Sequence, residues 1–260
     1  MDVEAADAEW TAHFVAALGI EVWHEADRTL GRAELRPEMW TPGTEVPRLG
    51  VLATMADLVG GIRPSGPINP TVDLRVTLLS RPPAGGTVLL VCHPVKVGRR
   101  LFVGEVILHT GDAHQPFARS TVTFMNQGMG ETPITFGPRP REPIGAPSFD
   151  DLLRPRVTAP GVVEMDAHAS VSNGPGGTIQ GGAQALLAEI AAEGMLAPRG
   201  RYHAVDLEIR YLNRVKGETV TAVAEVIDGD LGDVCVRVPI NDSDAGGRVV
   251  SLVSVICREL

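Results

Sequence analysis

The strongest constraint on the fold of this chain is an internal repeat. The segment VDLRVTLLSR begins at Val72 and VDLEIRYLNR begins at Val205, so the two copies are 133 residues apart. Each copy is followed by a glycine-containing turn and a Thr-Val pair, which begins at Thr87 in one copy and at Thr219 in the other. Stretches of alternating β-branched residues then close on ARSTVTFMN or VVSLVSVICRE, which predicts antiparallel strands. Self-similarity at a fixed spacing indicates that one structural unit occurs twice.

A mostly apolar helix is predicted before each copy of the repeat. These helices are PRLGVLATMADLVGGI at 47–62 and QGGAQALLAEIAAEGML at 180–196. A helix that is apolar on most faces must be covered on most faces. A curved antiparallel sheet wrapped around its own helix provides this cover, and two such units side by side would join into one longer sheet.

The repeat divides the chain into two units and a connection. We expect the N-terminal unit at 1–126 and the C-terminal unit at 160–260. The range between them, 127–159, contains QGMGETPITFGPRPREPIGAP, which is rich in Pro and Gly and has no hydrophobic periodicity. This composition predicts a linker that runs over the surface.

A glycine-rich loop opens the second helix, in the segment SNGPGGTIQGGAQALLAE at 172–189. Backbone N–H groups and the positive end of the helix dipole converge at such a helix start, where they can bind an anion or polarise a carbonyl. The dinucleotide spacing G-x-G-x-x-G fails, because Ile179 stands at its third glycine position. The phosphate-binding G-K-[ST] and the esterase G-x-S-x-G are also missing from the sequence. The glycines therefore indicate another kind of site.

Charge and cysteine content narrow the class of protein further. The net charge of −9 argues against nucleic-acid binding, which needs a basic face. The N-terminal stretch MDVEAADAEWTAHFVAALG is acidic where a signal peptide is basic, and no apolar run approaches membrane-spanning length, so we expect a cytoplasmic protein without membrane association. The cysteines Cys92, Cys235 and Cys257 lack the spacing of a zinc site or a disulfide framework. No metal and no cofactor are expected.

The loop, helices and strands together resemble the hotdog fold, and more narrowly the PaaI-like acyl-CoA thioesterases, here as a tandem double hotdog. The resemblance implies an α+β protein in which one long curved antiparallel sheet wraps two central helices. The family carries an Asn, a His-Gly-Gly at the helix start, and an Asp nine residues after the His. The matching positions are Asn173, Gln180, Gly181, Gly182 and Glu189 in the second half and Thr41, Arg48, Leu49, Gly50 and Asp57 in the first half. Neither half keeps the His, and only the second half keeps the Gly-Gly pair.

The resemblance also implies that each site lies between the two units, with the helix start of one unit facing the carboxylate of the other. One site then combines Asn173, Gly181 and Gly182 with Asp57, and we expect it to be the main one. The other combines Thr41 and Gly50 with Glu189. Glu189 and Glu193 are spaced i, i+4, which is also the pattern of a solvent-exposed helix face, and for Glu189 this interpretation is preferred.

The chemistry of thioester hydrolysis suggests a role for each residue of the main site. Negative charge develops on the carbonyl oxygen, and the N–H of Gly182, beside Gly181, can stabilise it because glycine permits close approach. Asn173 would hold the attacking water or the carbonyl. Asp57 would act as a general base or as a nucleophile, and its predicted burial should raise its pKa. Gln180 and Gly50 are assigned to substrate binding.

The hairpin tips of the two halves differ in charge. KVGRRL in the first half corresponds to DGDLGD in the second half. Arg99 and Arg100 in the basic tip would suit the phosphates of CoA through charge-assisted hydrogen bonds.

These observations favour an acyl-CoA thioesterase that releases free acid and CoA. The alternative is a non-catalytic acyl-CoA-binding protein, because the His is lost and the first half is degenerate. A hydratase is disfavoured because the D-x-N-P-x-x-H signature is missing from the sequence. The expected partner is acyl-CoA, and the expected assembly is a monomer or a homodimer of the tandem unit.

Overall fold

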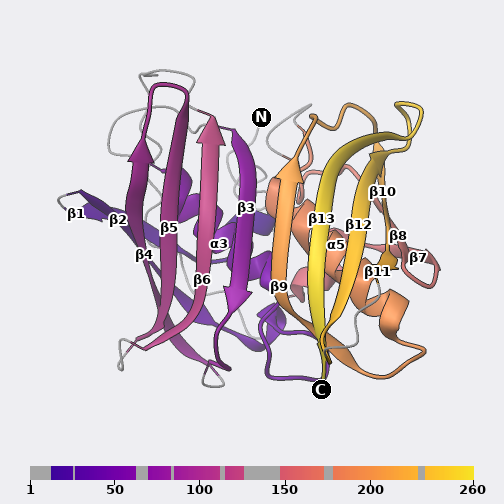
Figure 1. Cartoon of the computed structure of the whole chain (residues 1–260), viewed down its shortest axis with the longest axis horizontal. Coiled ribbons are helices and arrows are strands. Elements are labelled where there is room, and N and C mark those ends of the chain that lie inside the picture. Colours follow the sequence, from indigo (N-terminus) through magenta and orange to yellow (C-terminus); the bar gives the residue numbers. More distant parts are fainter. Residues whose placement is uncertain are drawn as a thin grey trace, which may run out of the picture.

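One long antiparallel sheet lies across two central helices, α3 and α5 (Figure 1). A computed structural model of the chain describes residues 13–25, 27–62, 70–82, 85–111, 115–125, 147–172, 178–227 and 232–260. Within these residues the sheet contains 13 strands. This architecture is the tandem hotdog that the sequence predicted.

The two halves share one order of main elements, namely a short helix, two strands, a long helix and then a run of antiparallel strands. The first half consists of α2 (Phe14–Ala17), β1 (Glu21–Glu25), β2 (Arg28–Leu35), a 3-10 turn (Pro37–Met39), α3 (Leu49–Gly61), β3 (Thr71–Leu78), β4 (Gly86–Val97), β5 (Leu101–Thr110) and β6 (Pro116–Met125). The second half consists of α4 (Phe149–Leu153), β7 (Arg156–Ala159), β8 (Val162–Asp166), α5 (Gly181–Leu196), β9 (Tyr202–Tyr211), β10 (Thr219–Val223), β11 (Glu225–Ile227), β12 (Val234–Asp242) and β13 (Arg248–Glu259).

Strand order confirms the duplication. From the outer edge to the centre, the first half runs β1-β2-β4-β5-β6-β3 and the second half runs β7-β8-β10-β12-β13-β9. Strand β11 pairs with β12 and continues the line of β10. The helices predicted at 47–62 and 181–196 are α3 and α5.

The halves join through an antiparallel pairing of β3 with β9. Arg75 pairs with Glu208, and these two residues are equivalent in the repeat. On either side, Leu74 pairs with Ile209 and Val76 pairs with Leu207. A register in which a residue pairs with its own equivalent places a pseudo-twofold axis at that pair. The repeat found in the sequence is therefore the symmetry of the molecule.

Part of the predicted linker range, 127–159, has regular structure. Helix α4 begins with a capping box, in which the Ser148 hydroxyl accepts from the Asp151 N–H at 3.0 Å and the Asp151 carboxylate accepts from the Ser148 N–H at 3.3 Å. Strand β7 pairs with β8 at the edge of the sheet. The Pro- and Gly-rich residues 126–146 lie outside the described residues. Helix α4 becomes important because it carries Asp150.

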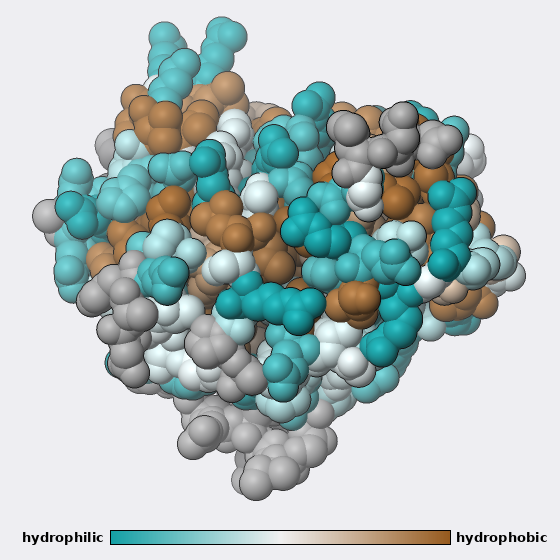
Figure 2. Space-filling view, turned by 60° about the horizontal axis from the view of Figure 1, so that its bottom comes forward, coloured by the Kyte–Doolittle hydropathy of each residue, from teal (hydrophilic) through white to brown (hydrophobic). Residues whose placement is uncertain are grey.

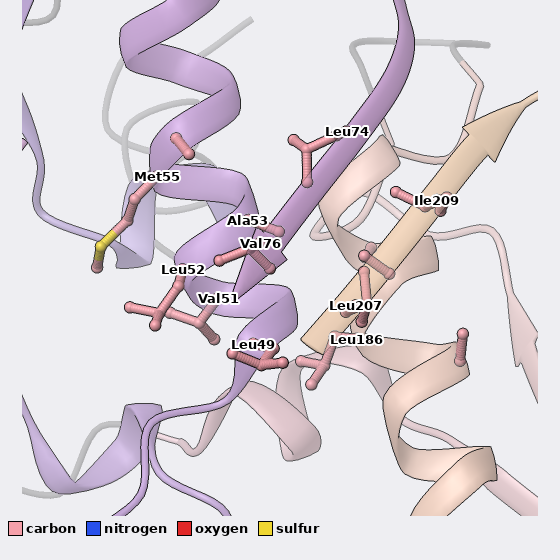
Figure 3. Close-up of a cluster of buried hydrophobic side chains, with 14 of the residues drawn as sticks. Leu49, Val51, Leu52, Ala53, Met55, Leu74, Val76, Leu186, Leu207 and Ile209 are labelled. Atoms are coloured by element: carbon pink, nitrogen blue, oxygen red, sulfur yellow. The ribbon is translucent and has the colours of Figure 1, made fainter. Parts of the chain in front are cut away.

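The hydrophobic core is continuous between the two halves. Figure 3 shows side chains of α3 and β3 beside Leu186, Leu207 and Ile209 of the second half. The mostly apolar sequences of α3 and α5 explain why each helix lies beneath a curved sheet, although α5 also buries Gln184 and Glu189. On the face shown in Figure 2, hydrophilic and hydrophobic residues are interspersed, and no single kind of side chain covers it. No helix among the described residues is long and apolar enough to cross a membrane.

Helices α3 and α5 meet through glycines at equivalent positions. A Cβ added at Gly50 would lie 2.5 Å from the Leu186 Cα, and one added at Gly182 would collide with the Thr54 hydroxyl. Gly50 is equivalent to Gly182, and Thr54 is equivalent to Leu186. The two contacts are therefore one contact repeated by the pseudo-twofold axis. Glycine at these positions lets the helix backbones approach closely.

Replacing Gly50 by Ala should destabilise the protein, because the new methyl group meets the backbone of α5 and the helices must move apart. Overpacking of this kind costs about 1–3 kcal/mol. The free energy of unfolding in urea measures the effect. Gly194→Ala is the matched control within α5, since an added Cβ there has its nearest neighbour at 3.8 Å. That control should be neutral or stabilising by up to about 1 kcal/mol. Equal effects of the two changes would contradict the importance of the close crossing.

Candidate active site

The start of α3 holds a carboxylate from the opposite half. The Glu189 carboxylate accepts hydrogen bonds from the N–H of Leu49 at 3.1 Å and from the N–H of Gly50 at 2.8 Å. Glu189 is 1% exposed. The interpretation of Glu189 and Glu193 as a solvent-exposed helix face is therefore wrong, because both side chains turn toward the first half.

A buried arginine explains the inward orientation of these glutamates. Arg48, at the N-cap of α3, is 3% exposed. Its guanidinium donates to Asp150 on α4, with Nε 2.9 Å from Oδ1, and it also contacts Glu193. Its Nη1 lies 3.7 Å from the Glu189 Oε1. Sequence reasoning missed this cluster, because Asp150 fell within the range predicted as linker.

The cluster around Arg48 contains three carboxyl groups and one guanidinium. Burial raises the pKa of Glu189 to about 8, with the charge of Arg48 opposing the shift and the charge of Glu193 adding to it. Burial also raises the pKa of Glu193, again against Arg48. Asp150 is the third carboxylate next to the guanidinium. One arginine facing three carboxylates favours retention of a proton on the buried glutamates.

The amides at the start of α3 thus donate their hydrogen bonds to another residue of the chain, Glu189. The Gly50 N–H, predicted to contact substrate, donates to Glu189. Thr41, the counterpart of Asn173, is buried, and its hydroxyl has no hydrogen-bond partner among the described residues. In this structure the Glu189 carboxylate and the Leu49 and Gly50 amides bind each other, and the place of Thr41 in the same site stays a prediction.

The start of α5 differs from the start of α3. Gln180 is the N-cap, and its side-chain oxygen accepts from the Ala183 N–H at 2.9 Å. The amides of Gly181 and Gly182 make no hydrogen bond to another residue of the described segments. Asn173, predicted to lie at the rim, falls outside the described residues. The donors that bind Glu189 in one half are therefore not used by a described carboxylate in the other half.

Asp57 occupies the position on α3 that Glu189 occupies on α5. Its Oδ1 accepts from the Thr71 hydroxyl at 2.6 Å. Burial raises its pKa to about 6, and the hydrogen bond from Thr71 opposes the shift. The direction agrees with the expectation from the sequence. Asp57 is one methylene shorter than Glu189, and its carboxylate is held by β3 of its own half.

Tyr211, at the end of β9, links Asp57 to the start of α5. A Cβ added at Gly181 would lie 2.8 Å from the Tyr211 hydroxyl oxygen and 2.9 Å from Cζ, so the tip of the ring touches the first residue of the helix. The pKa of Tyr211 is raised well above its ordinary value by burial and then by the charges of Asp57 and Asp73. Asp57 and Gly181, from different halves, are thus neighbours of the same side chain. The sequence carried no signal for Tyr211, because strand patterning alone does not show which helix it meets.

The basic hairpin tip lies at the same end of the sheet as Asp57. Thr71 pairs with Phe124, Phe124 with Phe102, and Phe102 with Val97, so one row of residues crosses β3, β6, β5 and β4. In Figure 1 this row is at the top, where β4 turns into β5. Three strand spacings amount to roughly 14 Å. The turn carries Arg99 and Arg100, both exposed.

The strand ends that flank the acidic tip lie at the opposite end of the sheet. The tip residues 228–231 lie outside the described residues, but Val234 at the start of β12 pairs with Cys257, near the C-terminus at the bottom of Figure 1. The basic tip therefore lies toward the end of the sheet where Asp57 is found, and the strands that lead to the acidic tip run toward the other end.

Replacing Glu189 by Gln should flatten the dependence of stability on pH. The pKa of Glu189 rises from 4.5 to about 8 on folding, so the folded chain binds this proton more tightly than the unfolded chain. The free energy of unfolding then falls as the pH rises from about 4.5 to 8. Each unit of pKa difference corresponds to about 1.4 kcal/mol. The test compares urea unfolding of wild type and variant across this pH range.

The exposed Glu218 supplies the control for loss of a surface carboxylate, as Glu218→Gln. The wild-type free energy should fall relative to that of Glu189→Gln as the pH rises. Parallel curves for wild type and Glu189→Gln would show that the cluster holds no additional proton in the folded chain.

No protein-family model and no curated protein matches the chain. Solved structures do match it. A hot dog fold protein of unknown function from Alicyclobacillus acidocaldarius is 10% identical, with a TM-score of 0.64 over 95% of this chain and 97% of that chain. An acyl-CoA thioesterase II from Mycobacterium marinum is 14% identical, with a TM-score of 0.61 over 94% and 97%. The 12:0-ACP thioesterase from Umbellularia californica is 10% identical, with a TM-score of 0.59 over 91% and 99%. At these identities the likeness shows the hotdog fold.

Proposed function

We propose that the chain is an acyl-CoA thioesterase with one main active site, between the start of α5 and Asp57. The observation that carries the proposal is the difference between the two helix starts. At α3 the amides bind Glu189, whereas at α5 they make no hydrogen bond to a described residue, and Tyr211, which touches Gly181, senses the charge of Asp57, a carboxyl group with a raised pKa. Backbone donors next to a carboxyl of this kind suit acyl transfer to water. The thioesterase names of several structural neighbours support the same reaction class.

Each residue of the proposed site would have its own role in the reaction. The N–H of Gly182, together with that of Gly181, stabilises the negative charge on the thioester oxygen. Asp57 is ionised at neutral pH with a pKa of about 6, so it can accept a proton from the attacking water. The carbon–sulfur bond then breaks, and the sulfur of CoA takes this proton. Direct attack by Asp57 to form an anhydride is the other route.

Thr71 positions the carboxylate for this task. Its hydroxyl donates to Oδ1 of Asp57, which leaves Oδ2 without a hydrogen bond to another described residue. Gly182 has two reasons to lack a side chain. Its Cα packs against Thr54, and its amide belongs to the proposed oxyanion site. Its packing role alone does not explain why the amide is left without a partner among the described residues.

A second candidate function is acyl-CoA binding without catalysis. It is favoured by Gln180, which replaces the family's His and uses its side-chain oxygen to cap α5. One experiment separates the two functions, namely release of free thiol from a panel of acyl-CoAs, followed with a thiol reagent. Thiol release supports the enzyme. Saturable acyl-CoA binding without thiol release supports the binding protein and overturns the proposed enzyme.

Asp57→Asn should lower kcat by on the order of a hundredfold to ten-thousandfold, which is what a general base contributes. In the wild type, kcat/KM should fall as the pH drops through about 6, because the protonated carboxyl cannot accept a proton. Glu189→Gln is the comparison in the other half and should change kcat much less, provided that both variants are assayed while folded. Equal losses would indicate two working sites, and full activity of Asp57→Asn would contradict its catalytic role.

Replacing both Arg99 and Arg100 by Ala should raise KM for acyl-CoA by more than about tenfold and leave kcat nearly unchanged. The reason is that each arginine pairs with CoA phosphate through charge-assisted hydrogen bonds, which contribute about 1.5–3 kcal/mol each when desolvated and less at an exposed turn. Short pantetheine thioesters lack the nucleotide phosphates and provide the control substrate. An equal rise in KM for both substrates would show that the tip does not recognise the nucleotide end.

A further inference from the structure

The Tyr211 hydroxyl lies against Gly181, the first residue of α5. The hydroxyl oxygen, Cζ and Cε1 of Tyr211 lie 2.8, 2.9 and 3.0 Å from the position that a Cβ on Gly181 would occupy. The end of the ring therefore rests on the first residue of the helix, where the Gly181 and Gly182 N–H groups begin the helix without a hydrogen-bond partner among the described residues. A hydroxyl and two amides thus lie at one helix start.

The Tyr211 hydroxyl is not used by the fold. It makes no hydrogen bond to another described residue, Asp57 and Asp73 included. Tyr211 packs against the core as a partly buried residue. A phenol that contributes only packing could be replaced by Phe, and the hydroxyl group therefore needs another explanation.

The other half of the molecule provides an internal comparison. In the repeat, Tyr211 on β9 corresponds to Leu78 on β3, and both residues pack against the core. Leu78 belongs to the first half, where Glu189 binds the amides at the start of α3. The second half therefore has a hydroxyl group at this strand position, and the first amides of its helix α5 have no partner among the described residues. The first half has an apolar side chain at the equivalent position, and the amides of its helix α3 bind Glu189. This correlation points to a ligand that uses both kinds of donor.

We infer that the Tyr211 hydroxyl donates a hydrogen bond to the carbonyl oxygen of the thioester, together with the amides of Gly181 and Gly182. This inference rests on the proposed thioesterase function and adds a catalytic residue to it. As the water oxygen attacks the carbonyl carbon, the carbon–oxygen π electrons move onto the oxygen, and Tyr211 stabilises that charge while keeping its own proton. The charge returns to re-form the carbonyl when the carbon–sulfur bond breaks. Because the pKa of Tyr211 is raised by burial and by Asp57, the phenol remains a donor throughout.

The experiment exploits the two tyrosines of the chain, Tyr202 and Tyr211, which begin and end the same strand. Tyr211→Phe keeps the ring against Gly181 and removes only the hydroxyl. Loss of one oxyanion donor lowers kcat by on the order of a hundredfold to a thousandfold. KM should change by no more than a few-fold. Tyr202→Phe, at the far end of β9, is the matched control and should retain wild-type kcat.

A binding measurement separates the proposed contact from a structural role. A thioether analogue of the substrate, in which CH₂ replaces the carbonyl group, offers no oxygen to Tyr211. It should bind wild type and Tyr211→Phe equally well, whereas a packing defect would weaken its binding to the variant.

The two hypotheses fail in different ways. Full kcat in Tyr211→Phe, with an active wild type, overturns the role of Tyr211 and leaves the thioesterase in place. A loss of kcat accompanied by weaker thioether binding also overturns it, in favour of packing. A wild type that releases no thiol from any acyl-CoA overturns the proposed function and this inference with it.

Discussion

The close crossing of α3 and α5 determines where each candidate site residue lies. Gly50 rests on the backbone of Leu186, and Gly182 rests on Thr54, so neither helix can carry a side chain at the contact. At this distance the start of one helix reaches the carboxylate on the other, as the hydrogen bonds from Leu49 and Gly50 to Glu189 demonstrate. A wider crossing would separate the helix amides from these carboxylates. The same glycines therefore serve the packing of the core and the construction of a site between the halves.

Side-chain length then makes the two symmetric positions unequal. Glu189 is long enough to reach the amides of α3, where Arg48 lies next to its carboxylate. Asp57 is shorter, and its carboxylate binds Thr71 on β3 instead. A buried ion cluster such as that of Arg48 adds little net stability compared with apolar side chains, but loss of one partner costs about 3–5 kcal/mol. The amides of α3 are thus occupied by Glu189, whereas Asp57 binds Thr71 and the first two amides of α5 have no hydrogen-bond partner among the described residues.

Three differences between the two halves support the functional interpretation, and all three occur at the same end of the sheet. That end has helix amides with no partner among the described residues, a carboxyl group with a pKa raised to about 6, and a hairpin turn with two exposed arginines. The opposite end has the arginine cluster and the ends of the two strands that flank the segment DGDLGD. A duplicated chain under no functional constraint has no reason to gather these differences at one site. Their coincidence supports one catalytic site rather than two.

The sequence by itself determined the duplication, the two central helices and the antiparallel strands, because hydrophobic periodicity and the repeat spacing can both be read along the chain. The pairing of carboxylates with opposite helix starts was instead implied by the resemblance to the hotdog thioesterases. Only the tertiary structure decided which other residues each of these polar side chains contacts. Asp150 meets Arg48 from 102 residues away, in a range whose composition indicated a linker, and Glu189 turned inward although its spacing from Glu193 suggested an exposed face. Tyr211 touches Gly181 because a strand end and a helix start converge in space, and no local pattern in the sequence records a contact between two elements that fold separately.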